Sequence, residues 1–409
     1  MKKIFFIILL TFVLTKAKSQ EDSSNDCLRY LKEVRTDFSA NTDLMTDSIV
    51  DNHQLFFIGE MHGFHDNYKL AYKLIEEFKR KTNFKYILSE QDFAATTKLN
   101  YYISNADTIG LSKFIMAFKT SPSWCKEKYE FYKKIIELNK KYDKNIQFFG
   151  VDITAGGIKP SLMRIKEITQ KYHMEDTRLD SIIASPSMKT SIILYIKQLS
   201  ENSSLLSFNE EDAFEYKYHL NNILNFNKAL NTSNWDLVRD SCMFENYRML
   251  EEHYGLQDEK MIGAWGQTHG FQQQSNSVKW FASRLKRNLG KKIYTYRIFY
   301  FDSKCMLPAR WIPGFLKVFR SKKKLYYNVK LQNDDHWATG YKQGLEYLKK
   351  ISPSETISFF DLEKFDSPYR NGDDLVMGIL NNAVTTDYFQ TAIVVRNSKP
   401  TETFGSNKK

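Results

Sequence analysis

The chain has 409 residues, of which 42% are hydrophobic and 26% are charged, and its formal net charge is +11. Beyond the N-terminal segment no apolar run approaches the roughly 20 residues that a transmembrane helix needs, so we expect no stable membrane span. The four cysteines are far apart and form no C-x-x-C pair, which argues against a structural zinc site built from them.

The N-terminus has the pattern of a secretory signal peptide. Lys2 and Lys3 precede an apolar run over residues 4–14, and small residues follow before Gln20. A basic start, an apolar stretch and a small-residue cleavage site define such signals. We therefore expect residues 1–19 to be removed and the protein to be exported, either to the periplasm or out of the cell. In an oxidising compartment one or two disulfides can form, and the sequence leaves their pairing open.

The positive charge is moderate once the expected signal is removed. Its four lysines take the net charge from +11 to +7, and the remaining lysines are spread along helical patterns. This distribution favours a solvated basic surface. We expect no nucleic-acid partner, because no recognisable nucleic-acid-binding module accompanies the charge.

Short apolar runs alternate with helical patterns along the chain. A helix is predicted over residues 67–81, where Leu70 and Leu74 belong to an apolar stripe at helical spacing. Such alternation indicates an α/β fold with a mostly parallel central sheet and flanking helices. Strands are predicted at 54–59, 84–90, 145–151, 260–265, 292–299 and 391–395.

A long helical interval interrupts this alternation at about residues 159–254. Its strongest helical patterns cover residues 205–230 and 235–254. We interpret the interval as a helical insertion, which either covers the carboxyl edge of the sheet or packs on one of its faces.

The remaining segments complete a single-domain prediction. Residues 20–399 are expected to form one α/β domain that includes the insertion. Residues 301–355 contain prolines and mixed charge and receive no firm assignment. Residues 400–409 form a polar tail that we expect to be disordered.

The first predicted strand ends in an unusual polar loop, Gly59-Glu60-Met61-His62-Gly63. Side chains two residues apart in an extended chain project to the same side, so Glu60 and His62 are predicted to lie together. The flanking glycines allow close approach of the backbone. A buried core strand has no use for this pair, so we interpret it as part of a site.

Three further strand ends carry polar side chains. Glu90 ends the second predicted strand, Asp152 follows the third, and His269 follows the fourth. Each residue alone is explained as well by a helix cap, a solvated loop or a structural histidine. The carboxyl ends of parallel strands lie along one edge, however, and that edge is where open α/β sheets bind ligands. We therefore predict that these residues converge with Glu60 and His62.

Several segments also stand in the order of a known family signature. They are 59–63, Ser89-Glu90, 238–246, 265–269 and 387–394. Together they resemble the erythromycin esterase family over most of the expected mature chain. The resemblance implies an α/β hydrolase that cleaves an ester with histidine-activated water and requires no metal.

The resemblance also implies roles for individual residues. His62 would act as general base, Glu60 and Glu90 would orient it or the water, and His269 would assist at the carbonyl. The sequence departs from the family at Met61, which alone separates Glu60 and His62 where the family usually has two residues. A small-molecule ester other than a macrolide is therefore the expected substrate.

Two other classes of function remain open. The shortened loop also resembles the wider superfamily, which includes haem-binding lipoproteins and Tiki-type metalloproteases. In that reading Glu60, His62, Glu90 and His269 are candidate ligands of a divalent metal, or the protein binds haem. The third class is a binding protein that keeps the fold and a ligand pocket without catalysis. Neither a serine nucleophile elbow nor an H-E-x-x-H helix is present.

Overall fold

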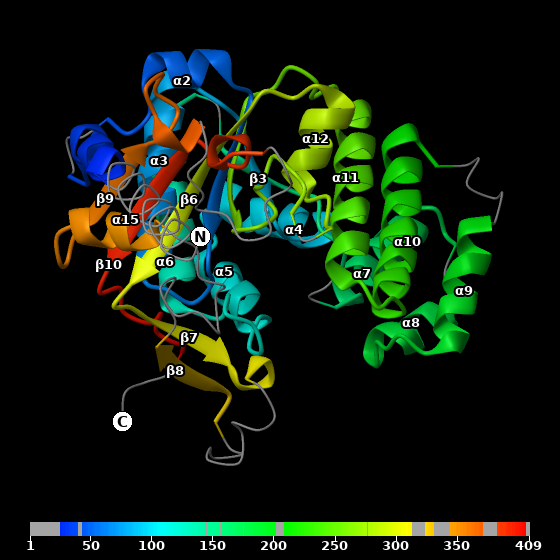
Figure 1. Cartoon of the computed structure of the whole chain (residues 1–409). Coiled ribbons are helices and arrows are strands. Elements are labelled where there is room, and N and C mark those ends of the chain that lie inside the picture. The colour runs from blue at the N-terminus through cyan, green and yellow to red at the C-terminus, as the bar shows by residue number, and fades with distance from the viewer. Residues whose placement is uncertain are drawn as a thin grey trace, which may run out of the picture.

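The structure is a computed structural model that describes residues 25–39, 43–143, 145–154, 157–174, 176–201, 208–275, 277–312, 324–330, 344–370 and 383–405. Within these ranges the chain forms an α/β fold around an eight-stranded, mostly parallel sheet (Figure 1). The strand order is β1-β9-β10-β6-β2-β5-β3-β4. The predicted signal peptide lies outside the described residues.

All six predicted strands belong to this sheet, and each neighbouring pair among them is parallel. The predicted fold class is therefore confirmed. Their bounds are β2 Leu55–Glu60, β3 Tyr86–Ser89, β4 Gln147–Gly150, β5 Met261–Gly266, β6 Ile293–Phe301 and β10 Thr391–Arg396.

Four strands were not predicted. β9 (Ile357–Asp361) and β1 (Arg35–Asp37) extend the sheet beyond β10 with antiparallel pairing. β7 (Lys304–Pro308) and β8 (Tyr326–Lys330) form a separate antiparallel hairpin. β1 is short and exposed, so it lacks the apolar signal on which strand prediction depends.

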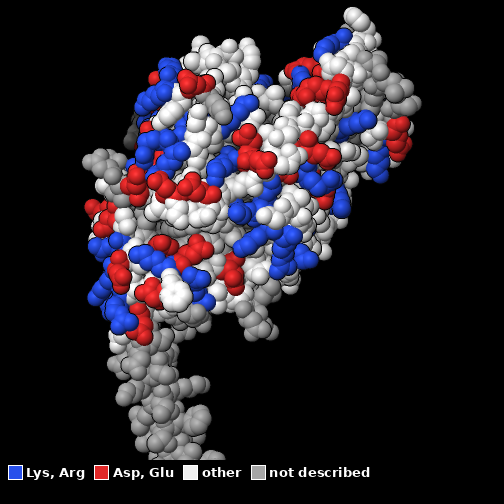
Figure 2. Space-filling model, turned by 90° about the horizontal axis from the view of Figure 1, so that it is seen from above, with Lys and Arg blue, Asp and Glu red and all other residues white. Residues whose placement is uncertain are grey.

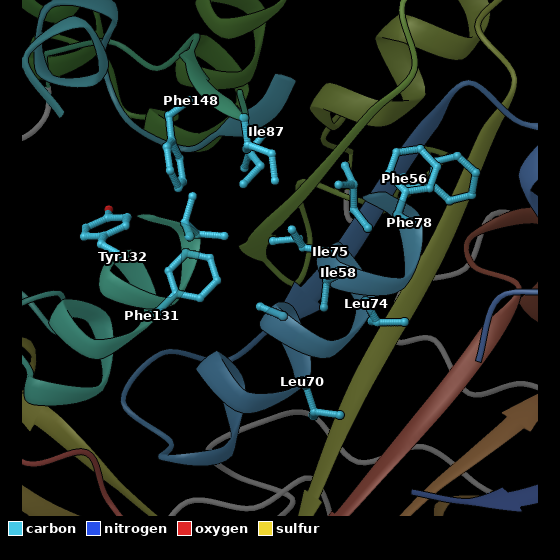
Figure 3. Packing of buried hydrophobic residues seen from close by; sticks show 14 of the residues in the cluster. Phe56, Ile58, Leu70, Leu74, Ile75, Phe78, Ile87, Phe131, Tyr132 and Phe148 are labelled. Atoms are coloured by element: carbon cyan, nitrogen blue, oxygen red, sulfur yellow. The ribbon is translucent and has the colours of Figure 1, made fainter. Parts of the chain in front are cut away.

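One face of the sheet is covered by helices from the first third of the chain. Phe56 and Ile58 of β2 pack there against Leu70, Leu74 and Phe78 of α3, which confirms the predicted helix (Figure 3). The helices on this side are α2 Asp47–Asn52, α3 Asp66–Thr82, α4 Phe93–Ser104, α5 Thr108–Met116 and α6 Lys126–Asn139.

The other face receives the last helix of the helical interval. Leu55 and Phe57 of β2 point to this side, because neighbouring strand residues alternate, and they cluster with Met243 and Tyr247 of α11 and with Phe281 of α12. α11 is Trp235–Tyr254 and α12 is Phe281–Leu289.

The earlier helices of the interval share a hydrophobic cluster of their own and stand beside the sheet (Figure 1). They are α7 Lys159–Lys171, α8 Thr177–Ala184, α9 Thr190–Glu201 and α10 Glu210–Leu230. The interval therefore packs α11 on the face of the sheet and brings the first turns of α11 to the carboxyl edge. Shorter helices are α15 Leu345–Ile351, η2 Ala309–Trp311, η3 Pro368–Arg370 and η4 Thr385–Asp387.

The end of the chain is ordered where disorder was expected. Pro400 pairs with Phe64, and Thr403 pairs with Cys125, so the expectation was wrong for residues 400–405. Residues 406–409 lie outside the described part. Residues 400–405 are held because their backbone groups form hydrogen bonds with other parts of the chain. The N–H of Thr401, for example, donates to the carbonyl of Gly63 at 2.9 Å.

Two further findings bear on the predicted environment. Cys125, Cys242 and Cys305 are buried thiols that form no disulfide. Among the described helices, none combines the length and the apolar character needed to cross a bilayer.

Candidate functional site

The loop that follows β2 holds Glu60 and His62 together. Nδ1 of His62 lies 3.0 Å from Oε1 of Glu60, and the two side chains are 36% and 11% exposed. Gly63 has a φ of 90°, and a Cβ there would lie 2.2 Å from the carbonyl oxygen of Met306. Only glycine fits this position, so the loop is fixed against β7 immediately after His62.

The protonation of His62 depends on the neighbouring acids. Burial lowers the pKa of His62, but the hydrogen bond to Glu60 and the charges of Glu90 and Glu60 raise it, and the net effect is a pKa above the usual value. Nε2 of the same ring has no hydrogen-bond partner among the described residues. With Nδ1–H donated to Glu60, Nε2 is free to accept a proton.

The side chains of Glu90 and His62 both lie close to Gly266, at the end of β5. Glu90 accepts the N–H of Gly266 at 2.6 Å through Oε2. A Cβ at Gly266 would lie 3.4 Å from Oε2 of Glu90, 3.6 Å from Nε2 of His62 and 3.2 Å from Cδ2 of His269. The missing side chain thus leaves space that the carboxylate and the two rings surround.

Arg239, in the second turn of α11, connects the remaining acids. Its Nε and Nη2 donate to the two oxygens of Asp152 at 2.9 and 2.6 Å, and Nη2 also donates to Glu90 at 2.8 Å. Although burial raises the pKa of Glu90, the positive charges of His269, Arg239 and His62 hold it well below its ordinary range. Glu90 is therefore a carboxylate at neutral pH.

His269 lies behind Arg239. Its Nε2 is 3.1 Å from Nη1 of Arg239, and its Nδ1 is 2.8 Å from Oδ1 of the fully buried Asp240, although not aligned as a hydrogen bond. Asp240 accepts the N–H of Phe281 through its other oxygen, at 2.6 Å. Burial lowers the pKa of His269, and Asp240 and Glu90 raise it to a net value above normal.

These residues lie around a cavity of about 500 Å³ at the carboxyl edge. Glu60, His62, Glu90, Asp152 and Arg239 line it, together with residues from the loop before α6 and from η2. The predicted convergence of Glu60, His62, Glu90, Asp152 and His269 is therefore present. His269 is the one of the five that does not line the cavity, because Arg239 and Glu90 stand in front of it.

Sequence reasoning gave no role to Arg239 or Asp240. Both lie in the segment 238–246 that contributed to the family resemblance, which was the available signal. Their partners come from β3, β4 and the loop after β5, so their roles depend on how α11 packs on the sheet.

The proposed metal ligands do not form a metal site in the described part of the chain. No group of three or more His, Cys, Asp and Glu side chains there is arranged to hold an ion. Two of the four candidates, Glu90 and His269, already contact the guanidinium of Arg239. A cation bound by both would have to displace the positive charge of Arg239, so the residues do not fit a metal as placed.

Comparison with known proteins supports the fold. No family model and no curated protein sequence matches the chain. A Bacillus cereus protein of solved structure is similar over 93% of this chain and 99% of its own, with a TM-score of 0.64 and 14% identity. A succinoglycan biosynthesis protein matches over 93% and 98%, with a TM-score of 0.61 and 13% identity.

An erythromycin esterase variant in its open conformation is similar as well. It matches over 88% of this chain and 94% of its own, with a TM-score of 0.60 and 13% identity. The fold and the site together thus define the class of this protein: an α/β protein with a polar cavity at the carboxyl edge of a mostly parallel sheet. The chain shares this fold with erythromycin esterase, as its sequence resemblance predicted.

Proposed function

We propose that this protein hydrolyses a carboxylic ester with water activated by His62. The observation that carries the proposal is the surroundings of the imidazole: Glu60 holds its Nδ1, and His62 lines a cavity together with Glu90 and Arg239. A carboxylate that fixes the tautomer and stabilises the imidazolium is the arrangement that general-base catalysis needs.

In the proposed reaction, Nε2 of His62 takes a proton from water while the water oxygen forms a bond to the ester carbonyl carbon. The carboxylate of Glu90 orients this water from the opposite side of the space over Gly266. The tetrahedral intermediate then collapses, the bond to the alcohol oxygen breaks, and the leaving oxygen takes the proton back from the imidazolium. The products are a carboxylic acid and an alcohol, and His62 returns to its neutral form.

We assign to Arg239 the role of hydrogen-bond donor to the carbonyl oxygen of the ester. A guanidinium has five N–H donors, and the contacts with Asp152, Glu90 and His269 account for four of them. The fifth, on Nη1, remains for the oxygen on which negative charge develops. The family resemblance implies that His269 assists at the carbonyl, and its contact with Arg239 supports a role in which it positions that guanidinium.

The first experiment compares the mature protein with His62→Ala on a panel of small esters and macrolactones. We expect turnover of at least one ester, a loss of about 10²–10⁴-fold in the variant, and activity that persists after chelation of metals. Equal rates for both proteins would reject His62 as the base. Turnover that disappears on chelation and returns with one metal would replace this mechanism with the metal-dependent alternative.

Export is part of the same proposal. The basic start, apolar run and small residues before Gln20 support it. N-terminal sequencing of protein recovered from the periplasm or the medium is expected to begin near Gln20. An intact Met1 on protein confined to the cytoplasm would refute it.

A further inference from the structure

Two cations line the same cavity without a carboxylate partner in the described part of the chain. Lys128, in the first turn of α6, is half-buried, and its Nζ donates to Oγ of Ser123 at 3.0 Å and lies 5.1 Å from the centre of the Phe118 ring. Arg310, in η2, is exposed. One hydrogen bond uses one of the three donors of an ammonium, so Lys128 retains donors for a ligand.

The other charged side chains of the cavity pair with one another, and among them the acids outnumber the cations. Arg239 is paired with Asp152 and Glu90, and His62 is paired with Glu60. Asp92 also lines the cavity, and burial raises its pKa to about 7, so its negative charge is reduced at neutral pH. Lys128 and Arg310 are therefore the cations of this cavity that form no ion pair in the described part of the chain.

The two cations line the same cavity as the reacting groups. Lys128 contributes to the electrostatic environment of His62, on which its charge acts against protonation. Trp311, next to Arg310, lies with its ring centre 6.4 Å from that of His62. The walls of the cavity also include Phe118 and Ala117, which suit a short apolar chain.

We infer that the preferred substrate is an ester that also carries a second, ionised acid group, which Lys128 and Arg310 bind while the ester carbonyl lies beside His62. This inference rests on the proposed esterase function. The acid is identified only as an anion at the far end of a short chain. A carboxylate and a phosphate monoester share the chemistry that two such cations recognise.

The test compares two esters of equal chain length, mono-4-nitrophenyl glutarate and 4-nitrophenyl pentanoate, which differ in a terminal carboxylate. We expect a higher kcat/KM for the glutarate ester, and a smaller preference at high ionic strength because salt screens the attraction. Lys128→Gln and Arg310→Gln should each reduce the preference about tenfold, the usual size of a hydrogen bond to a charged group. A phosphate-terminated ester of similar length then shows which anion is preferred.

Lys126→Gln is the matched control, because Lys126 is exposed on the same helix and does not line the cavity. Lys128→Arg should retain most of the preference. A preference that survives Lys128→Gln and Arg310→Gln together, or that Lys126→Gln reduces equally, would overturn the inference while leaving the esterase proposal intact.

Binding separates the two proposals further. Calorimetric titration with the 4-nitroanilide of glutaric acid, whose amide resists hydrolysis, should show binding that Lys128→Gln weakens about tenfold. Such binding without turnover of either ester would support the anion site and reject the esterase. Turnover of both esters with no preference for the anion would support the esterase and reject the anion site.

Discussion

Glu60 controls the acid–base behaviour of His62, and the sequence predicts this pair directly. The two residues are two apart at the end of an extended strand, and their side chains meet at 3.0 Å. Because the neutral ring is the proposed base, the proposed activity should fall as the pH drops through the pKa of His62, which lies above its usual value.

Replacing Glu60 with glutamine tests this control. Glu60→Gln removes a negative charge that raises the pKa of His62, so the acidic limb of the profile of kcat/KM against pH should move to lower pH. The maximum should also fall, by about 10-fold or more, because the imidazolium loses its partner. A limb that keeps its position would show that Glu60 does not set the pKa of His62.

Asp240 is the acid that lies against Nδ1 of His269, at 2.8 Å. Asp240→Asn is expected to lower the pKa of His269, since the buried ring keeps its desolvation and loses its nearest negative charge. The amide of asparagine would also favour a proton on Nε2, facing the donor of Arg239. We expect kcat to fall about 10–100-fold with a smaller change in KM.

NMR titration of the His269 ring provides the readout that a purely structural role would not change. Asp236→Asn, one turn earlier in the first turn of α11, is the control. A His269 pKa that is equal in Asp240→Asn and in the unmodified protein would contradict the positioning role.

At the scale of elements, Asp92 both caps the N-terminus of α4 and lines the cavity. Asp92 is the N-cap, and its Oδ1 accepts the N–H of Ala95 at 2.9 Å. Burial, with a smaller contribution from the charge of Asp152, raises its pKa from 3.8 to about 7 despite that hydrogen bond. The folded state therefore holds this proton more tightly than the unfolded state, and Asp92 makes the protein less stable as the pH rises from about 4 to 7.

Asp92→Asn should remove this pH dependence and keep the cap, because asparagine is as good an N-cap residue as aspartate. We expect the free energy of unfolding at pH 8 to rise by up to about 4 kcal/mol, with no difference near pH 4. Urea denaturation at the two pH values measures this. Asp107→Asn, the same change at the half-buried N-cap of α5, is the control. If Asp92→Asn instead has a lower free energy of unfolding than the unmodified protein at pH 8, the charge of Asp92 is needed for stability.

At the scale of the whole molecule, the end of the chain supports the loop that carries His62. The carbonyl of Gly63 accepts both the N–H of Thr401 and the N–H of Met306, each at 2.9 Å. The N–H of Glu402 donates to Glu127 at 3.0 Å, and the ring of Phe404 lies 4.9 Å from that of Tyr129. Residues more than 200 positions away thus hold the loop in place.

Truncation after Lys399 should therefore lower both stability and the proposed activity. Loss of the five hydrogen bonds that residues 401–404 make with the rest of the chain corresponds to about 5 kcal/mol. The value of kcat/KM should fall because His62 loses its support. Thermal denaturation and ester hydrolysis check the two effects. Truncation after Gly405 is the control, and equal behaviour of the two truncated chains would show that the segment 400–405 has no supporting role.

The molecular surface carries charges of both signs. On the face seen in Figure 2, Lys and Arg side chains are interspersed with Asp and Glu. This distribution supports the interpretation of the net positive charge as a solvated surface.

The sequence by itself determined the six parallel strands, the helix over α3 and the pairing of Glu60 with His62. These features follow from periodicity within a few residues, which local backbone geometry converts directly into structure. It also placed Glu90, Asp152 and His269 at strand ends, because apolar runs stop there.

The tertiary structure decided which strand ends are neighbours and what stands between the side chains. β2, β5, β3 and β4 lie side by side, and α11 packs across them so that Arg239 and Asp240 enter the site. The antiparallel strands β1 and β9 and the hairpin β7–β8 likewise depend on partners distant in sequence. A helix residue acquires its partners from the element against which the helix packs, and no local pattern in the chain encodes that contact.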